Sequence, residues 1–263
     1  MKRAARSAND NPAFQIAARL GFAVNGLLHL MIGAIAISVA LGGGGSADQT
    51  GALAGLAATP GGGIILWVVV VGLAGLGLWQ IAEAILVPAK DPAKKWAHRA
   101  KEFGKAVAYL AVAATAFTFA RGGSSSSSGD TESFTATLLA AHGGVVVVVV
   151  IGLGIIVIGA YFVVQGARKK FTEDLSLPGG TIGTTITALG VVGHIAKGVA
   201  LAVVGILFAV ASVTLDASKS TGLDGAVASL AALPFGAAIL FTVGAGLIGF
   251  GLYSFARARY ARL

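Results

Sequence analysis

The sequence has no cysteine, only six prolines and few charged residues in a length of 263. The absence of cysteine excludes a disulfide framework, a thiolate nucleophile and a cysteine-ligated metal site. Asp, Glu, Lys and Arg make up 11% of the chain, whereas about 25% is usual in a soluble domain. Together with 56% hydrophobic residues and a mean hydropathy of +0.86, this composition indicates an integral membrane protein.

Sequence motifs of known chemistry are also missing. The chain contains no Gly-x-Ser-x-Gly, no Walker-type nucleotide loop and no His-Glu-x-x-His, so these signatures of nucleophile, phosphate and zinc sites do not apply. His29 and His194 are expected at different depths in the membrane, which argues against their being two axial ligands of one haem. We therefore predict that the protein is not an enzyme and holds no cofactor and no metal.

Six apolar stretches are long enough to cross a bilayer as helices, which takes ~20 residues. They cover residues 20–41, 64–87, 103–120, 144–165, 187–213 and 236–256. Runs such as Val145 to Val150 favour strands in water, but in lipid an open sheet would leave backbone groups without hydrogen bonds. We predict an all-α bundle of six transmembrane helices.

The six spans are arranged as three tandem hairpin repeats. Gly51-Ala-Leu-Ala-Gly-Leu-Ala-Ala-Thr-Pro60 resembles Gly225-Ala-Val-Ala-Ser-Leu-Ala-Ala-Leu-Pro234, and Ala140-Ala-His-Gly-Gly144 is a shorter copy. Repetition in one direction predicts pseudo-threefold symmetry. The predicted order is a basic N-terminal segment (1–17), repeat 1 (18–88), a basic linker (89–102), repeat 2 (103–168), a second linker (169–186), and repeat 3 with a basic C-terminus (187–263).

A Gly/Ser-rich loop joins the two spans of each repeat and continues into a stretch with helical spacing. Asp48, Asp130 and Asp224 stand near the starts of these stretches, where an Asp can cap free N–H groups. We predict short interfacial helices in the three outer loops. They would form either a lid ring over a central cavity or packing that seals the bundle.

The distribution of Lys and Arg predicts the orientation of the chain. Near the ends of the spans, only Arg121 and Lys219 fall on one side, and the other Lys and Arg residues fall on the opposite side with both termini. The positive-inside rule then places the termini in the cytoplasm. The net charge of +8 is interpreted as attraction to anionic inner-leaflet lipid, worth ~1 kcal/mol per basic residue near the surface, and not as nucleic-acid binding.

Three repeated sequence features resemble a known family. The opening Ala18-Arg-Leu-Gly-Phe22, the pattern Gly51-Ala-Leu-Ala-Gly-Leu-Ala and the ending Gly77-Leu-Trp-Gln80 resemble the bacterial membrane proteins grouped as domain of unknown function 1206. The resemblance implies six membrane helices in three pairs, in a bacterial cytoplasmic membrane, and no established activity. Repeat 2 departs most from the pattern, with Lys101-Glu102-Phe103-Gly104 at its opening.

Polar residues within the spans are the candidate functional residues. Alignment of the repeats places Asn25, Lys105 and Lys197 at one position, His29 and Tyr109 at another, and Glu83 opposite Arg257. Charged residues at such depth usually face the bundle interior and mark pathways or ion pairs, although lysine can also extend its amine to the headgroups. For Glu83 we expect a cationic partner among Lys197, Arg19 and Arg257.

Glycines at helical spacing predict where the helices pack. Gly26 and Gly33 in the first span correspond to Gly198 and Gly205 in the fifth. Small residues allow close backbone approach where lipid provides no hydrophobic drive.

Two functions follow as hypotheses. The first is a non-enzymatic structural or accessory membrane protein that binds anionic lipid on its cytoplasmic face, as a homo-oligomer or with a partner membrane protein. The second is a transporter or channel for an ion or small solute, with a path along the pseudo-threefold axis. A flux screen in liposomes distinguishes the two.

Overall fold

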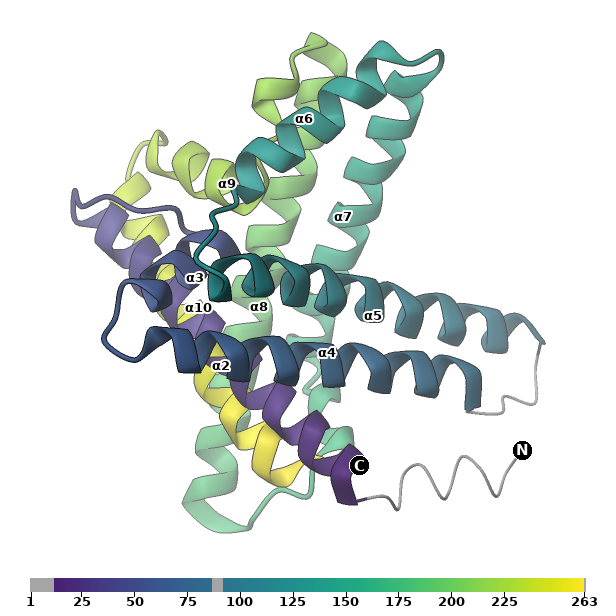
Figure 1. Ribbon diagram of the computed structural model, residues 1–263, viewed down its shortest axis with the longest axis vertical. Coiled ribbons are helices and arrows are strands. Elements are labelled where there is room, and N and C mark those ends of the chain that lie inside the picture. The colour runs from purple at the N-terminus through teal and green to yellow at the C-terminus, as the bar shows by residue number, and fades with distance from the viewer. Residues whose placement is uncertain (1–11, 87–91, 263) are drawn as a thin grey trace. The chain divides into compact units, whose positions relative to one another are not determined.

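The computed structural model describes residues 12–86 and 92–262, and this part of the chain contains six long helices in three successive pairs, with a short helix between the two members of each pair (Figure 1). The long helices are α2 (Pro12–Ala40), α4 (Gly62–Leu86), α5 (Pro92–Ala120), α7 (Gly144–Ala167), α8 (Gly180–Thr214) and α10 (Gly236–Tyr260). Each contains a stretch long and apolar enough to cross a membrane. The all-α prediction and the six apolar helices are confirmed, and the protein is a multi-pass membrane protein.

Several helices begin earlier than the predicted spans. Helices α2 and α5 start at Pro12 and Pro92, because proline at the first helical position lacks an N–H that would be unpaired there anyway. Helix α8 starts at Gly180, seven residues before the predicted span. These added turns are polar or mixed in sequence, so hydropathy alone does not mark them.

Short helices occupy the three loops between paired spans, as predicted. They are α3 (Gln49–Ala57), α6 (Ser127–Ala140) and α9 (Gly222–Ala231). The 3-10 turn η2 (Ala217–Lys219) precedes α9 in the same loop, and the 3-10 turn η1 (Lys170–Asp174) lies between α7 and α8. The N-cap prediction is confirmed for Asp48, whose Oδ1 accepts a 2.8 Å hydrogen bond from the N–H of Gly51. It is wrong for Asp130, because Ser126 caps α6 instead.

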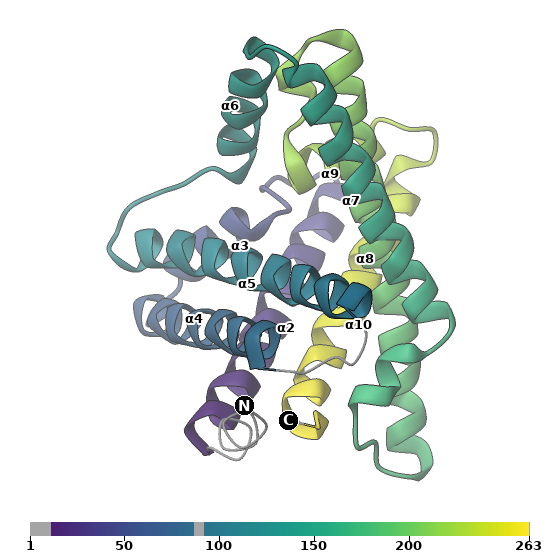
Figure 2. The same ribbon diagram turned by 90° about the vertical axis from the view of Figure 1, so that its right-hand side faces the viewer.

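The helices divide into two compact units. In its described part, unit 1 contains residues 12–26, 53–86, 92–124 and 254–262, and unit 2 contains residues 27–52 and 125–253. In unit 1, α4 and α5 lie side by side (Figures 1 and 2). In unit 2, α7 and α8 do the same. Helices α2 and α10 contribute to both units.

Glycines bring helices of different repeats into backbone contact. A Cβ atom added to Gly205 would lie 2.6 Å from the carbonyl oxygen of Gly152, and one added to Gly33 would lie 2.6 Å from that of Gly244. Gly33 and Gly205 are equivalent in the repeats, as are Gly152 and Gly244. Helix α10 thus packs on α2 through the same positions by which α7 packs on α8. Cyclic pairing of this kind is what threefold symmetry requires, and the symmetry itself stays a prediction.

Glycines also pack the two helices within a repeat. A Cβ atom on Gly21 of α2 would lie 2.6 Å from the Cβ atom of Leu76 in α4. At the equivalent positions, a Cβ atom on Gly193 of α8 would lie 2.5 Å from the Cα atom of Phe250 in α10. The first and third repeats therefore share one packing geometry between their two spans.

The three loops meet in unit 2 through hydrogen bonds that the sequence did not reveal. The N–H of Ala47 donates to Oδ1 of Asp224 over 2.9 Å, and the N–H of Ser127 donates to Oγ1 of Thr50 over 3.3 Å. Asp224 therefore binds a neighbouring loop, and the prediction that it caps α9 is wrong. The first bond links the loop between α2 and α4 to the loop between α8 and α10, and the second links it to the loop between α5 and α7. Ala226 of α9 packs in the core formed by α7 and α8.

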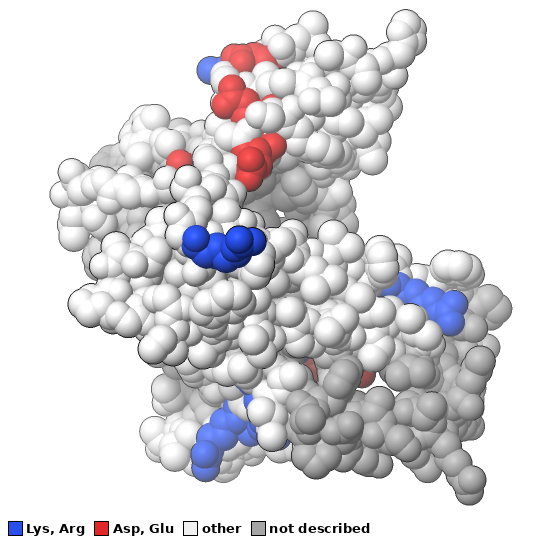
Figure 3. Space-filling model, viewed as in Figure 1, with Lys and Arg blue, Asp and Glu red and all other residues white. Residues whose placement is uncertain are grey.

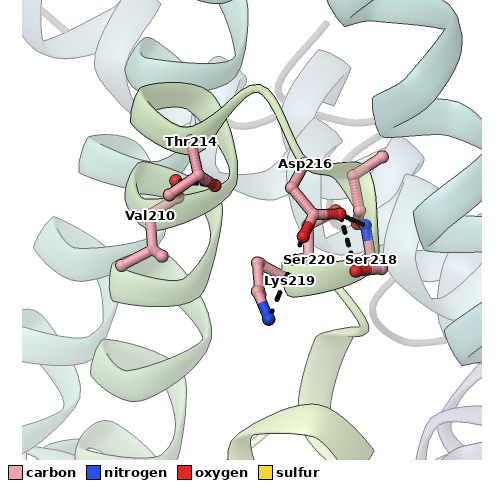
Figure 4. A network of polar contacts seen from close by, with 7 residues as sticks. Val210, Thr214, Asp216, Ser218, Lys219 and Ser220 are labelled. Carbon is pink, nitrogen blue, oxygen red and sulfur yellow. Dashed lines mark hydrogen bonds and ion pairs between the residues drawn. The ribbon is translucent and has the colours of Figure 1, made fainter.

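Charged side chains are sparse on the face shown in Figure 3, where Asp and Glu gather near α6. In the turn after α8, Asp216 accepts hydrogen bonds from Oγ and the backbone N–H of Ser218, at 2.6 and 3.1 Å (Figure 4). These bonds hold the pKa of Asp216 below its ordinary value. Any stability that they contribute is therefore present at neutral pH and lost as the pH falls through the lowered pKa.

Left-handed backbone conformations recur on both sides of each loop. At the first position, φ is +84° for Gly42, +79° for Gly122 and +53° for Leu215; at the second, it is +79° for Gly61, +76° for Gly143 and +62° for Phe235. Repeats 1 and 2 place glycine at both positions, whereas repeat 3 places Leu and Phe. A side chain in this conformation costs ~1–2 kcal/mol.

We predict that Phe235→Gly raises the free energy of unfolding by ~1 kcal/mol, because it removes this conformational strain. The Phe235 side chain is 85% exposed, so little packing is lost. Equilibrium unfolding in detergent measures the change. Gly143→Ala, at the equivalent turn of repeat 2, should lower stability instead. A loss of stability in Phe235→Gly would contradict the prediction.

Candidate functional site

Among the described residues, a group of polar and aromatic contacts in unit 2 is centred on His194 of α8. Gly190 and Gly193 flank this histidine on the same helix and allow aromatic side chains close to its backbone. Nδ1 of His194 lies 2.7 Å from the carbonyl oxygen of Gly190. Donation by Nδ1–H to this carbonyl fixes the ring in the tautomer with Nε2 unprotonated when the histidine is neutral.

Aromatic rings from three further elements surround His194, which is 3% exposed. Phe171 of η1 stacks on it at a centroid distance of 4.7 Å and an interplanar angle of 11°. Phe250 and Tyr253 of α10 approach edge-on at 5.1 and 5.0 Å. Phe162 of α7 is 6.0 Å away. We call these five residues, with His29 and Lys197, the aromatic cluster.

Lys197 and His29 join the aromatic cluster through Phe250. The Nζ atom of Lys197 lies 4.4 Å from the ring centroid of Phe250 and 5.1 Å from that of Phe162. The His29 ring lies 4.7 Å from Phe250. A cation over aromatic faces gains ~0.5–2 kcal/mol, with the larger values where water is excluded. Two of the predicted polar residues, His29 and Lys197, are thus brought to one aromatic ring, in an arrangement that suits a protonated amine.

Unit 1 contains a second group, which we call the charged cluster: Arg19, Asn25, Glu102, Lys105, Tyr109 and Arg257. Nδ2 of Asn25 donates to Oγ of Ser254 over 3.3 Å. The guanidinium of Arg257 lies 4.4 Å from the ring centroid of Phe22. Arg257 also interacts electrostatically with Lys105 and Tyr109. Asn25, Lys105 and Arg257 therefore belong to one unit, whereas His29 and Lys197 belong to the other.

Glu102 is the buried carboxylate that sequence reasoning missed. It is 5% exposed and lies in the apolar helix α5, where Nζ of Lys105 donates to both of its oxygens at 2.8 and 3.0 Å. The sequence does contain a signal for this pair: Glu102 and Lys105 are three positions apart, which puts an acidic and a basic side chain on one face of a helix. The predicted linker, residues 89–102, includes Glu102, so hydropathy alone does not place this carboxylate in a span.

Glu83, for which the sequence predicts a cationic partner, lies half-buried on α4. Two of its three predicted partners make other contacts in the same unit: Nη1 of Arg19 donates to the carbonyl oxygens of Ala258 and Arg259 at 2.8 and 2.6 Å, and Arg257 lies over Phe22. The pairing of Glu83 with a cation stays a prediction.

Three of the four predicted packing glycines, Gly33, Gly198 and Gly205, lie at helix contacts. Cβ atoms on Gly198 and Gly205 would come within 2.5 and 2.6 Å of carbonyl oxygens in α7, and one on Gly33 would meet α10. Gly26 is buried.

Among the described residues, no group of three or more His, Asp and Glu is placed to hold a metal ion. The geometry of both clusters therefore offers cation–aromatic and ion-pair contacts.

A family model described as Domain of Unknown Function (DUF1206) matches the chain three times, over residues 20–86, 100–169 and 192–261. The chain belongs to this family. Each DUF1206 match contains one pair of spans, which confirms the three tandem repeats. The chain is also 28% identical over 253 residues to "Uncharacterized protein YxxB" of Bacillus subtilis (strain 168), covering 93% of this chain and 90% of that protein. No solved structure matches the chain.

Proposed function

We propose that this DUF1206 protein is a non-enzymatic structural or accessory protein of the bacterial cytoplasmic membrane that binds anionic lipid on its cytoplasmic face. The observation that carries the proposal is the backbone packing between helices. At Gly198, Gly205 and Gly33, no side chain fits between the paired helices. Helices in such contact leave no room for a solute between them, which favours a closed bundle over a transport path.

The contacts of the cations within the spans agree with a closed bundle. Lys197 lies over aromatic rings, Lys105 pairs with Glu102, and Arg19 binds backbone carbonyls. These contacts with other protein groups favour a closed bundle over an aqueous path. Lipid binding is supported by an open, mainly apolar groove of about 630 Å³ beside the start of α8, which extends from Lys169 to Val192.

The predicted orientation is a testable part of the proposal. Alkaline phosphatase fused after Gly44, Ser126 or Ser220 is expected to be active, and the same reporter after Leu263 inactive, because Lys and Arg are concentrated on the side of the termini. A cytoplasmic reporter at each site provides the reciprocal control. An active phosphatase at Leu263 would overturn the orientation.

Transport is the second candidate, and the aromatic cluster is the observation that favours it. His29, His194 and Lys197 are titratable side chains within apolar helices, where such groups often mark ion or proton pathways. Purified protein in liposomes of phosphatidylglycerol and phosphatidylcholine should show no ion or solute flux above empty liposomes if the bundle is closed. Flux that is lost in Lys197→Gln but kept in Lys219→Gln, an exposed control, would replace the structural proposal with transport.

A further inference from the structure

A pocket of about 500 Å³ opens between the end of α4 and the beginning of α5 in unit 1. Its lining consists of Ala84, Ile85, Trp96, Arg99, Ala100 and Phe103. Five of these residues are apolar or aromatic, and Arg99 is the single charge among them. The pocket therefore combines an apolar wall with one guanidinium group.

One hydrogen-bond donor of Arg99 has no partner within the described residues. Its Nε atom is buried and has no hydrogen-bond partner there. Its guanidinium carbon lies 5.8 Å from the ring centroid of Trp96, and this contact satisfies none of the N–H donors. A guanidinium presents five donors that match a phosphate or carboxylate, so the pocket is complementary to an anion.

Comparison with repeat 1 shows what the pocket lacks. Arg99 is equivalent to Arg19, because it follows Arg19 by 80 residues, the same offset that separates Asn25 from Lys105. Ala84 and Ile85 are equivalent to Ala258 and Arg259, which follow them by 174 residues. Arg19 donates to the carbonyl oxygens of Ala258 and Arg259, which occupy the last turn of α10.

At the equivalent place, Arg99 lines a pocket beside Ala84 and Ile85, and its Nε atom has no hydrogen-bond partner among the described residues. The same helix junction is thus closed by the arginine at α10 and open to a ligand at α4.

The surroundings select the chemistry of the ligand. Trp96 and Phe103, in the first part of α5, are 69% and 58% exposed, and Ile85, at the end of α4, is 64% exposed. Tryptophan at such a position is typical of the headgroup level of a bilayer. A water-soluble anion would gain little from contact with this apolar wall. A phospholipid can place its phosphate at Arg99 and its acyl chains against the exposed apolar side chains.

We infer that the Arg99 pocket is a specific site for an anionic phospholipid of the inner leaflet, with the phosphate bound by Arg99 and the glycerol and first acyl carbons packed on Trp96, Ile85 and Phe103. The inference rests on the proposed lipid-binding function and names its site.

Binding of palmitoyl-oleoyl phosphatidylglycerol to delipidated full-length protein in detergent, measured by native mass spectrometry, tests the site. Arg99→Gln is expected to weaken the tightest binding event about tenfold, since charge-assisted hydrogen bonds to the phosphate are lost. Arg99→Lys should restore part of the affinity. Lys101→Gln removes an exposed cation from the same helix and should change binding less than about twofold.

Three results would overturn the site. Wild-type affinity in Arg99→Gln would remove the pocket inference while leaving the proposed function in place. Equal binding of phosphatidylglycerol and phosphatidylcholine by the wild type would remove the proposed function and the site together. Displacement of the lipid by millimolar glycerol 1-phosphate would assign the pocket to a soluble phosphate. Should Arg99→Gln fail to fold, Ile85→Glu, which places a carboxylate beside Arg99, is expected to reduce lipid binding as strongly.

Discussion

Gly198→Leu and Gly205→Leu are each expected to lower the free energy of unfolding by ~3 kcal/mol or more, or to prevent folding. A Cβ atom at these positions would lie 2.5 and 2.6 Å from the carbonyl oxygens of Gly159 and Gly152. Both obstacles are backbone atoms in the middle of a helix, so they cannot move aside as a side chain would. Overpacking of a core costs ~1–3 kcal/mol when side chains can adjust, and here the helices themselves must separate.

Two control variants separate helix packing from a general sensitivity of α8. Val199→Phe adds volume next to Gly198 at a residue that is 39% exposed, and it should be tolerated. Leu201→Ala removes volume from a half-buried residue and should cost less than either glycine variant. Equal stability of all four variants in detergent unfolding would contradict the packing of α7 on α8.

Glu102→Gln is expected to lower the free energy of unfolding by ~1–3 kcal/mol, because Lys105 loses its counter-ion and the buried carboxylate site is left with a poorer acceptor. The side chain of Glu102 is 6% exposed and that of Lys105 is 38% exposed. The partial exposure of Lys105 lets its amine reach water, which places the loss below the ~3–5 kcal/mol that follows the breaking of a fully buried pair.

The double variant Glu102→Gln/Lys105→Gln measures the coupling between the two residues. If they stabilise the protein as a pair, the double variant should be nearly as stable as either single variant. Additive losses would show that Glu102 acts through other contacts.

Glu83→Gln is the matched comparison on α4. Since Glu83 is only half-buried, we expect a loss below ~1 kcal/mol. A larger loss that is restored by neutralising Arg19, Arg257 or Lys197 would instead establish the ion pair predicted from the sequence. Unchanged stability together with altered flux would assign Glu83 to a transport path.

Part of the candidate site could be predicted from the sequence. The positions of His29 and Lys197 within apolar spans marked them as unusual, because charge is costly in lipid. Their meeting at Phe250 could not be foreseen, since it depends on how α2, α8 and α10 pack. Phe162, Phe171 and Tyr253 are ordinary apolar or interfacial residues in the sequence, and only their convergence on His194 makes them a cluster.

Charge partners illustrate the same limit. Glu102 and Lys105 are neighbours along one helix, so local spacing contained the information, but the helix began at Pro92 and not at the predicted residue 103. Asp224 is predicted to cap its own helix, whereas in the structure it accepts a hydrogen bond from the N–H of Ala47 in another repeat. Contacts between residues far apart in the chain are set by packing, which no local pattern encodes.

The sequence by itself determined the class, the six apolar helices, the three repeats and the short helices in the loops of this protein. Hydropathy, span length and repetition can be read directly from the sequence. Because the backbone must satisfy its own hydrogen bonds in lipid, long apolar segments form helices. The tertiary structure alone decided which glycines meet which carbonyls, how the loops are bonded, and that Arg19 is satisfied by the end of α10 while Arg99 lines a pocket. These features depend on the distances between helices, which arise from close packing of the whole chain.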